Sequence, residues 1–139
     1  MKKYRIGYTQ GVFDMFHVGH LNILLGAKQH CDYLMVGVNA DSLVEKYKNK
    51  CPVIPEADRC IIVSNIRAVD ECFLVETLDK EEILKQHKFD AVFIGDDWKN
   101  SPRWLATEEA LAKYGVDVVY LPHTEGISST QLRQFAPQK

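Results

Sequence analysis

An aspartate and two histidines recur at three-residue spacing near the start of the chain. Asp14, His17 and His20 lie between or beside Gly11 and Gly19, within ten residues of an apolar run that predicts a first strand. Glycine permits close approach of the backbone to a ligand. Histidines at the start of a helix can point imidazole N–H groups at the same anion as the helix N–H groups. The pattern therefore favours a phosphate site beyond the end of a strand.

The same three side chains offer two other interpretations. Histidine and aspartate are both good zinc ligands, so Asp14, His17 and His20 could hold a metal ion. However, the chain completes no usual zinc signature. In addition, side chains at positions i, i+3 and i+6 of a helix do not stay on one face. The structural alternative is a capping aspartate beside two histidines whose partners are local. We favour phosphate over a metal held by protein alone, and leave these alternatives open.

Three more segments contain residues suited to binding a nucleotide. Lys46, Lys48 and Lys50 alternate in a lysine- and proline-containing stretch. Such runs are most often solvated surface, but in a loop after a second strand one or two of these lysines could reach a triphosphate. Residues 95–98 (Gly-Asp-Asp-Trp) follow an apolar run. There a carboxylate could bind a sugar or base and an indole could cover the site, while a plain strand-ending turn is an equal alternative.

The third segment, residues 124–130 (Thr-Glu-Gly-Ile-Ser-Ser-Thr), combines a glycine with several hydroxyl groups. It precedes a predicted terminal helix at 129–135. Ser128 or Ser129 could be the N-cap of that helix. The same helix start could also receive a phosphate, with the hydroxyl groups as donors. The two roles are compatible.

Apolar runs alternate with helical patterns along the chain, which predicts an α/β fold of βαβ units. We expect a Rossmann-like parallel five-stranded sheet with helices on both faces, in a single domain spanning residues 1–139. The loops that follow the strands carry all the unusual residues, and open parallel sheets bind ligands at that edge. The expected strands are 5–9, 32–39, 71–75, 91–95 and 116–121. The expected helices are 18–29, a short one from Asp41, 55–66, 79–87 and 101–115, and the ligand-binding loops are 9–17, 46–55, 95–100 and 122–129.

Composition limits the classes of partner. A net charge of −2 gives no reason to expect nucleic acid, and no apolar run approaches the length of a membrane helix, so we expect no membrane insertion. Cys31, Cys51, Cys60 and Cys72 lack the close spacing of a zinc knuckle or redox dithiol. Cys31 and Cys72 start apolar runs and are expected to be buried free thiols. The expected location is the reducing cytoplasm.

Together, the three motifs resemble the nucleotidyltransferases whose hallmark is His-x-Gly-His after the first strand. Residues 11–20 match that signature, 95–98 match the glycerol-phosphate enzymes, and 124–130 match the end motif of the cytidylyltransferases. The resemblance covers nearly the whole chain and is greatest to the glycerol-3-phosphate cytidylyltransferases. It implies transfer of a cytidylyl group from CTP to a small phosphorylated alcohol, with Mg²⁺ as cofactor, by a homodimer.

The resemblance also implies a role for each matching residue. Arg67, Asp70 and Trp98 would bind the acceptor. No metal site is implied from protein alone, because Mg²⁺ is usually held through phosphate oxygens, with Asp14 as an optional ligand. The implied catalytic residues are His17, His20, Lys48 and Asp14. The implied nucleotide-binding residues are Gly11, Val12, Phe13, Gly19, Lys50, Gly95, Asp97, His123, Thr124, Gly126, Ile127, Ser128 and Ser129.

Two departures from the family pattern keep other functions open. His123 stands where the family commonly has arginine, and the exchange removes a fixed cation with five donors. Residues 11–17 read more like the choline- and ethanolamine-phosphate enzymes. The alternatives are therefore one of those acceptors, an adenylyltransferase of the same superfamily, or a nucleotide-sensing domain without turnover.

Overall fold

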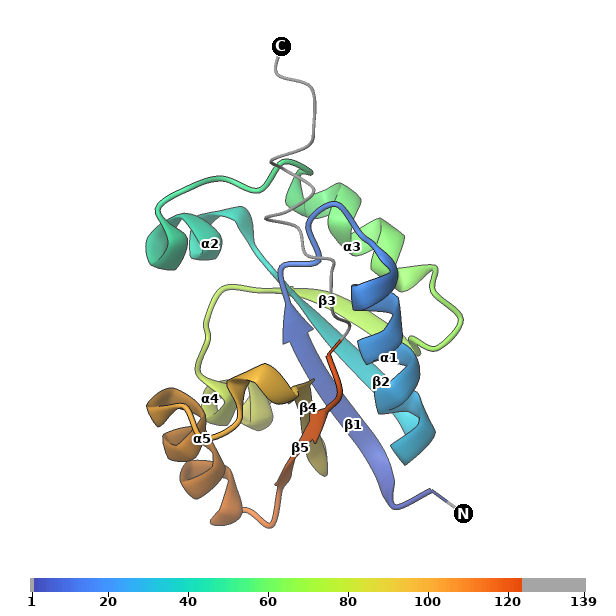
Figure 1. The fold of residues 1–139 in the computed structure, drawn as a ribbon, viewed down its shortest axis with the longest axis vertical. Coiled ribbons are helices and arrows are strands. Elements are labelled where there is room, and N and C mark those ends of the chain that lie inside the picture. Colours follow the sequence, from blue (N-terminus) through green and yellow to red (C-terminus); the bar gives the residue numbers. More distant parts are fainter. Residues whose placement is uncertain (1, 124–139) are drawn as a thin grey trace.

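A computed structural model describes residues 2–123 of the chain. Five parallel strands form one sheet in the order β3-β2-β1-β4-β5 (Figure 1). The strands are β1 (Tyr4–Gly11), β2 (Cys31–Asn39), β3 (Glu71–Val75), β4 (Ala91–Gly95) and β5 (Asp117–Leu121). The helices are α1 (Val18–His30), α2 (Asp41–Lys48), α3 (Glu56–Ser64), α4 (Lys80–Gln86), α5 (Pro102–Ala112) and the short 3-10 helix η1 (Asp96–Trp98).

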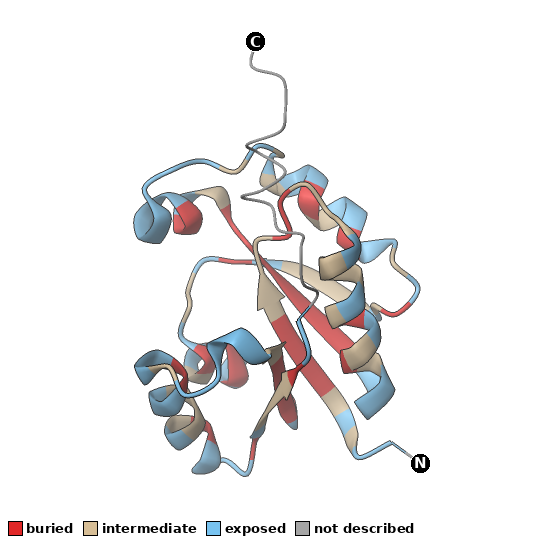
Figure 2. Cartoon of the chain, viewed as in Figure 1, coloured by how far each residue is buried: buried red, intermediate tan, exposed pale blue. Residues whose placement is uncertain are grey.

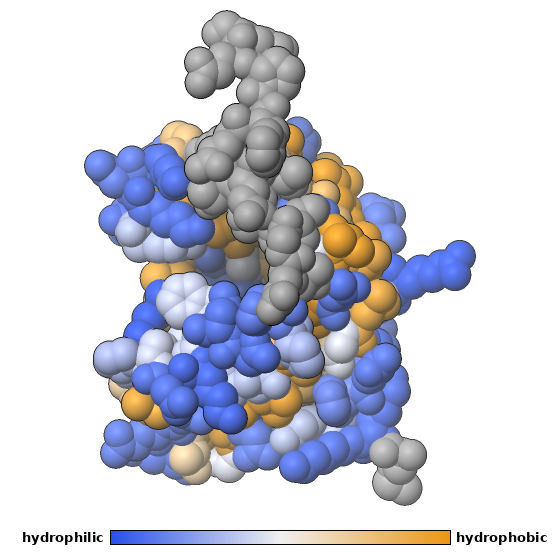
Figure 3. Space-filling view, in the orientation of Figure 1, coloured by the Kyte–Doolittle hydropathy of each residue, from blue (hydrophilic) through white to orange (hydrophobic). Residues whose placement is uncertain are grey.

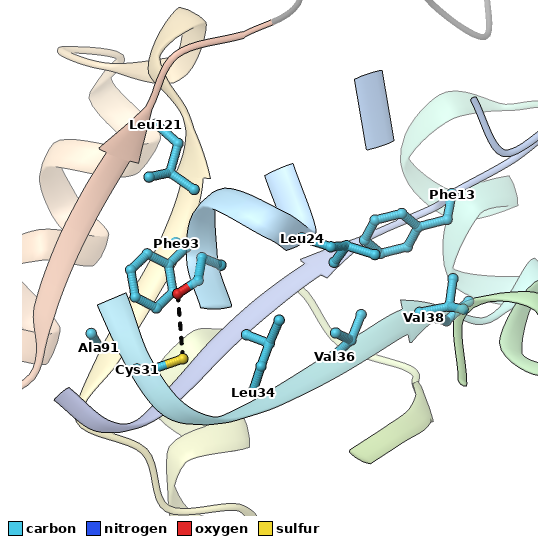
Figure 4. Close-up of a cluster of buried hydrophobic side chains, with 11 residues drawn as sticks. Phe13, Leu24, Cys31, Leu34, Val36, Val38, Ala91, Phe93 and Leu121 are labelled. Atoms are coloured by element: carbon cyan, nitrogen blue, oxygen red, sulfur yellow. Dashed lines mark hydrogen bonds between the residues drawn. The ribbon is translucent and has the colours of Figure 1, made fainter. Parts of the chain in front are cut away.

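Alternation along the strands creates a hydrophobic core on each face of the sheet. The side chains of Leu34, Val36 and Val38 on β2 pack under α1 and α3, and Met35 faces α4 and α5. Figure 4 shows this row of β2 side chains beside Leu24 of α1. The buried residues are concentrated in the central strands (Figure 2). Interior strands of a parallel sheet are buried on both faces and are therefore apolar throughout. The parallel sheet with a core on each face confirms the predicted fold class.

The order of the strands determines where a ligand can bind. The chain passes from β1 outward through β2 to β3, then returns to β4 on the other side of β1 and continues to β5. The strand order therefore reverses between β1 and β4. In open parallel sheets the crevice at the carboxyl ends of such a pair binds ligands. Gly11 ends β1 and Gly95 ends β4, so both predicted glycine motifs lie at this crevice.

The predicted element boundaries need one correction that affects the site. Residues 46–55 were expected to be a loop, but α2 continues to Lys48. Leu43 and Val44 are buried beneath the helix, and Asn49 ends it in a left-handed conformation (φ 56°). Asparagine tolerates that conformation, so it can close a helix much as glycine does. Lys46 and Lys48 thus lie on the last helical turn, where cations complement the helix dipole.

The cysteines and the helix lengths agree with most of the expectations. All four cysteines are free thiols, and Cys31 is buried as expected. Cys72 is only partly buried, because it lies on the edge strand β3, with its Sγ 3.5 Å from that of Cys60. Among residues 2–123, no helix has both the length and the apolar character that would let it span a membrane. The predicted terminal helix at 129–135 lies outside the described residues.

Candidate nucleotide-binding site

His17 and His20 form a reciprocal cap at the start of α1. The Gly19 N–H donates to His17 Nδ1 at 3.0 Å, and the His17 N–H donates to His20 Nδ1 at 3.2 Å. The two rings stack with their centroids 3.9 Å apart. Because both Nδ1 atoms accept hydrogen bonds, each neutral ring carries its proton on Nε2. Each histidine therefore has one nitrogen that shapes the helix start and one nitrogen that can donate to a ligand.

The Nε2 atom of His17 is an unsatisfied donor. It is buried and has no hydrogen-bond partner among the described residues. Leaving a buried donor unpaired costs about 1–3 kcal/mol, so such an atom indicates a missing acceptor. A phosphate oxygen at the amino end of α1 would satisfy this Nε2 and the free N–H groups of the first helical turn together.

Burial keeps the two imidazoles neutral. It lowers the pKa of His17, and it lowers the pKa of His20 to about 4, with a smaller contribution from the nearby His17. Asp14 opposes that shift but does not cancel it. At neutral pH both rings therefore act as hydrogen-bond donors rather than as positive charges.

Asp14 is tied to a neighbouring loop. Its side chain is buried, its Oδ2 accepts from the Val53 N–H at 2.8 Å, and its Oδ1 accepts from the Ile54 N–H at 2.9 Å. The carboxylate thus joins the loop after β1 to the loop before α3. Within residues 2–123, the only group of three or more His, Cys, Asp and Glu side chains close enough to share a cation is Asp96, Asp97 and His123. The geometry therefore does not favour a metal bound by Asp14, His17 and His20, and the catalytic role of Asp14 stays a prediction.

The loop between β1 and α1 is strained. Phe13 and Met15 have left-handed backbone angles, φ 54° and φ 50°. A bulky residue in this region is unusual, and each such residue costs on the order of 1–3 kcal/mol. The Phe13 ring is nevertheless buried in the core under α1, where Figure 4 shows it beside Leu24. A Cβ at Gly11 would lie 3.1 Å from that ring, so glycine lets the chain turn tightly at this point.

Arg59 holds the strained loop in place. This side chain is 1% exposed, and its NH1 donates to the carbonyl oxygens of Val12 and Asn39, both at 2.8 Å. Its Nε donates to the Ile54 carbonyl at 2.8 Å, and its NH2 pairs with Asp41. One guanidinium thus connects the ends of β1 and β2 to the starts of α2 and α3. The sequence analysis missed Arg59, although its spacing of four from buried Val63 places it on the inner face of α3.

The end of β4 is connected to the end of β5 through Asp96 and His123. The backbone N–H of His123 lies 3.4 Å from Asp96 Oδ1, and its Nδ1 contacts the same oxygen. The hydrogen bond from the His123 side chain holds the pKa of Asp96 below its ordinary value. The Asp97 side chain folds back over Gly95. A Cβ added at Gly95 would lie 2.7 Å from Asp97 Oδ1. Trp98 is 44% exposed, so its indole is accessible to a ligand.

The helix α2, which carries Lys46 and Lys48 and is followed by Lys50, lies at the same edge of the sheet as the loop after β1 (Figure 1). Lys46, Lys48 and Lys50 are all exposed, and Lys48 Nζ is 5.7 Å from the centroid of the Tyr47 ring. Their contact with phosphate stays a prediction.

Comparison with known proteins decides the family. The model of a family described as cytidylyltransferase-like matches residues 8–135. This chain belongs to the cytidylyltransferase-like family. The glycerol-3-phosphate cytidylyltransferase of Bacillus subtilis (strain 168) is 35% identical over 127 residues, which cover 91% of this chain and 92% of the relative. The bifunctional protein HldE of Caulobacter vibrioides is 32% identical over 129 residues, which cover 92% of this chain but 26% of that protein.

Solved structures support the same fold. The lipopolysaccharide core biosynthesis protein of Thermoplasma volcanium aligns with a TM-score of 0.75 and 27% identity, covering 88% of this chain and 99% of that one. Pantothenate synthetase of Thermus thermophilus aligns with a TM-score of 0.64 at 17% identity, covering 95% of this chain and 62% of that one, and this shows a shared fold alone.

Two residues that the family resemblance assigned to the acceptor lie away from the cytidylyltransferase-like signature. Asp70 precedes β3 and accepts from the Leu34 N–H at 2.8 Å, and it pairs with Lys28 at the end of α1. Leu34 is four residues before Val38, the β2 partner of Gly11, which is about 13 Å along the strand. Arg67 lies three residues before Asp70 and is exposed. Within a single chain, Arg67 and Asp70 therefore do not lie beside the crevice between β1 and β4. Their role in acceptor binding stays a prediction.

The family end motif lies beyond the described residues. Thr124, Gly126, Ile127, Ser128 and Ser129 belong to this part of the chain, so their predicted contacts with the nucleotide stay predictions.

Proposed function

We propose that this chain transfers the cytidylyl group of CTP to glycerol 3-phosphate, forming CDP-glycerol and releasing pyrophosphate. The observation that carries the proposal is the unsatisfied Nε2 donor of His17 at the amino end of α1, between β1 and β4. Similarity to a glycerol-3-phosphate cytidylyltransferase over 91% of the chain supports the nucleotide and the acceptor.

The reaction requires positioning more than proton transfer. An oxygen of the acceptor phosphate attacks the α-phosphorus of CTP, a new P–O bond forms, and the bond to the β-phosphate breaks. The attacking phosphate is already an anion, so no general base is needed. The protein must hold two anions in line and stabilise the negative charge that develops on the leaving pyrophosphate.

The described residues can supply that stabilisation. The Nε2–H groups of His17 and His20 would donate to the phosphates of CTP, together with N–H groups of the first turn of α1 other than that of Gly19, which donates to His17 Nδ1. Because both rings are neutral, positive charge has to come from elsewhere. Lys48 is the candidate on the chain, and bound Mg²⁺ would neutralise the triphosphate through the phosphate oxygens. The two Asp14 oxygens already accept backbone hydrogen bonds, which fits an ion held mainly by phosphate.

We also propose that the enzyme works as a homodimer. Ile61 and Ile62 on α3 are 59% and 42% exposed, and Leu74 on the adjoining edge strand is 40% exposed. Exposed apolar side chains on adjoining elements are typical of protein–protein contacts. Light scattering of the purified chain should give twice the monomer mass of 15.9 kDa, and Ile61→Asp with Ile62→Asp should give the monomer.

A pyrophosphate-release assay tests the proposed reaction. CTP and ATP would each be supplied with Mg²⁺ and glycerol 3-phosphate, ethanolamine phosphate or choline phosphate. We expect turnover with CTP and glycerol 3-phosphate. Turnover with ethanolamine phosphate alone would replace the acceptor but keep the reaction. Turnover with ATP alone would make the chain an adenylyltransferase, and CTP binding without pyrophosphate release from any acceptor would indicate a sensing domain.

A further inference from the structure

Two of the four cysteine thiols are in contact between α3 and the edge strand β3. Cys60 Sγ lies 3.5 Å from Cys72 Sγ, although 12 positions separate the two residues in the sequence. Both side chains are partly buried, and both are free thiols. The sulfurs of a disulfide lie about 2 Å apart, so an approach of about 1.5 Å would join these two. This thiol pair is therefore well placed to form a disulfide.

The other two cysteines have different partners. Cys31 is fully buried on β2, with its Sγ 3.4 Å from the Ala27 carbonyl oxygen. Cys51 is exposed, and its Sγ contacts Oε1 of Glu45, a carboxylate that raises the pKa of this thiol. A thiol that is held protonated reacts slowly, because the thiolate is the nucleophile. Cys31 and Cys51 therefore serve as internal controls for a reaction at the thiol pair.

The surroundings of the thiol pair determine the order in which the two sulfurs react. Burial raises the pKa of Cys72, and the neighbouring Cys60 raises it further. A protonated thiol is a poor nucleophile, which leaves the first attack on an oxidant to Cys60. The part of the shift that comes from Cys60 ends when the Cys60 sulfur is bonded to the oxidant. Cys72, already in contact with that sulfur, can then displace the oxidant from it.

The thiol pair lies next to the residue that holds the loop after β1. Cys60 directly follows Arg59, whose NH1 donates to the carbonyl oxygens of Val12 and Asn39. Cys72 is held in the ladder between β3 and β2, so the approach of the two sulfurs falls mainly on α3. Close-packed interiors transmit such displacements, and a movement of α3 towards β3 shifts Arg59 away from those carbonyl groups. A bond between the two sulfurs would therefore act on the nucleotide-binding site.

A small oxidant can reach this part of the molecule from one side. Ile61 follows Cys60 and is exposed, and Leu74, two positions after Cys72 on the same face of β3, is exposed as well. Figure 3 shows apolar residues gathered on the surface over α3. The proposed homodimer would cover the same surface, so we expect the dimer to be oxidised more slowly than the monomer.

We propose that Cys60 and Cys72 form a reversible disulfide within one chain, and that this disulfide weakens the binding of CTP. Disulfides of reducing compartments are usually transient, and serve catalysis or redox sensing. The effect on CTP rests on the proposed cytidylyl transfer, whereas formation of the disulfide does not depend on it.

The oxidant is a low-molecular-weight disulfide such as glutathione disulfide. The Cys60 thiolate attacks one of its sulfurs, the S–S bond breaks, and one glutathione thiolate leaves and takes up the proton that Cys60 has lost. The Cys72 thiolate then attacks Cys60 Sγ, the bond to the second glutathione breaks, and that thiolate takes up the proton of Cys72. The chain loses two electrons and two protons, and the oxidant becomes two molecules of glutathione. Excess glutathione reverses both steps.

A glutathione series tests the disulfide. The purified chain would be equilibrated at increasing ratios of glutathione disulfide to glutathione, and the remaining thiols would be alkylated before mass spectrometry of tryptic peptides. Trypsin cuts after arginine and lysine, so the expected crosslink joins peptide 60–67 to peptide 68–80. The same series on the monomeric variant, Ile61→Asp with Ile62→Asp, removes any shielding by the proposed homodimer.

Matched variants identify the sulfurs that react. Cys60→Ser should abolish the crosslink, and Cys51→Ser is the control that should keep it. Alkylation of both Cys60 and Cys72 in excess glutathione disulfide would overturn the proposal. A crosslink between two chains, visible on a non-reducing gel, would overturn it as well.

Calorimetric titration of CTP tests the effect on the nucleotide-binding site. Reduced and oxidised wild type would be compared, with Cys60→Ser treated in the same two ways. We expect oxidation of wild type to raise the Kd for CTP about threefold or more, dithiothreitol to restore it, and Cys60→Ser to show one Kd throughout. Equal Kd values for reduced and oxidised wild type would overturn the effect on CTP. No binding of CTP to reduced wild type would overturn the proposed function, whereas the disulfide is judged by the glutathione series alone.

Discussion

The backbone N–H of His17 donates to Nδ1 of His20, while Nδ1 of His17 accepts from the Gly19 N–H in the first turn of α1. This exchange assigns separate tasks to the two nitrogens of each ring. The Nδ1 atoms stabilise the start of α1, and the Nε2 atoms remain for the substrate. The two tasks can be separated by mutation, because asparagine and glutamine each reproduce one of the two nitrogens.

His17→Asn should remain folded but lose activity. The asparagine Oδ1 can accept from the Gly19 N–H as Nδ1 does, so the free energy of unfolding should stay within about 0.5 kcal/mol of wild type. The donor at the Nε2 position is lost, and removing one such donor lowers kcat on the order of 100-fold. His17→Gln should show the reverse, with an amide N–H near the Nε2 position but a loss of about 1 kcal/mol from the missing cap. Urea unfolding and pyrophosphate release measure the two effects. Full activity of His17→Asn would contradict the assignment.

Most of the fold could be predicted from local patterns. Strands 71–75 and 91–95 agree with β3 and β4 to the residue, because short apolar runs flanked by polar turns leave little choice of boundary. The end of α2 was misplaced, since it depends on the left-handed backbone of Asn49, and the lysines around it suggested a loop. The start of α1 was predicted correctly because its cap is formed by residues close in sequence, which a spacing pattern can reveal.

The parts of the site built from distant residues could not be predicted in the same way. Arg59 contacts carbonyl groups 20 and 47 positions away, and no local pattern encodes those partners. Asp14 holds a loop through the N–H groups of Val53 and Ile54, which follow it by 39 and 40 positions in the sequence. Arg67 and Asp70 came from family resemblance, which compares positions along the chain and carries no information on their distance from the crevice.

Arg59→Lys should destabilise the chain strongly. Lysine cannot donate to Val12, Asn39 and Ile54 at once, so buried carbonyl groups and Asp41 would lose their partners. We expect a loss of about 3 kcal/mol in the free energy of unfolding and weaker CTP binding, because the loop after β1 is released. Arg5→Lys, at an exposed position on β1, is the matched control and should change stability by less than about 0.5 kcal/mol. Equal urea midpoints for Arg59→Lys and Arg5→Lys would show that Arg59 does not hold the loop after β1 in place.

Stability should rise between pH 4 and pH 6.5 and then level off. Burial lowers the pKa of His20 to about 4 in the folded chain, below the ordinary value of 6.5. The unfolded chain therefore binds more protons in this range, and unfolding becomes easier as the pH falls. His20 alone accounts for up to about 3 kcal/mol over the interval. His20→Asn keeps an acceptor for the His17 N–H and cannot titrate. The difference in stability between wild type and His20→Asn should therefore depend on pH only below 6.5, and a constant difference would contradict the shift.

Asp14→Asn should reduce stability without changing the requirement for Mg²⁺. An amide has one oxygen, so either the Val53 N–H or the Ile54 N–H loses its acceptor, at a cost of about 1–3 kcal/mol. If the ion is held through phosphate oxygens, the Mg²⁺ concentration that gives half-maximal pyrophosphate release should match that of wild type. A rise of about tenfold or more in that concentration would make Asp14 a ligand of the ion.

Gly37→Ala should disturb the hydrogen bond between Tyr8 and Gln10 near the end of β1. A Cβ at Gly37 would lie 2.1 Å from the Tyr8 hydroxyl oxygen, so the tyrosine must move and its bond to Gln10 is lost. Overpacking of this kind costs about 1–3 kcal/mol. Tyr8→Phe removes the clashing oxygen, although the ring carbon stays 3.0 Å from the new methyl group. The double variant should therefore be more stable than the sum of the two single losses predicts, which urea unfolding of all four proteins would measure. Strict additivity would show that the hydroxyl is not the group that glycine accommodates.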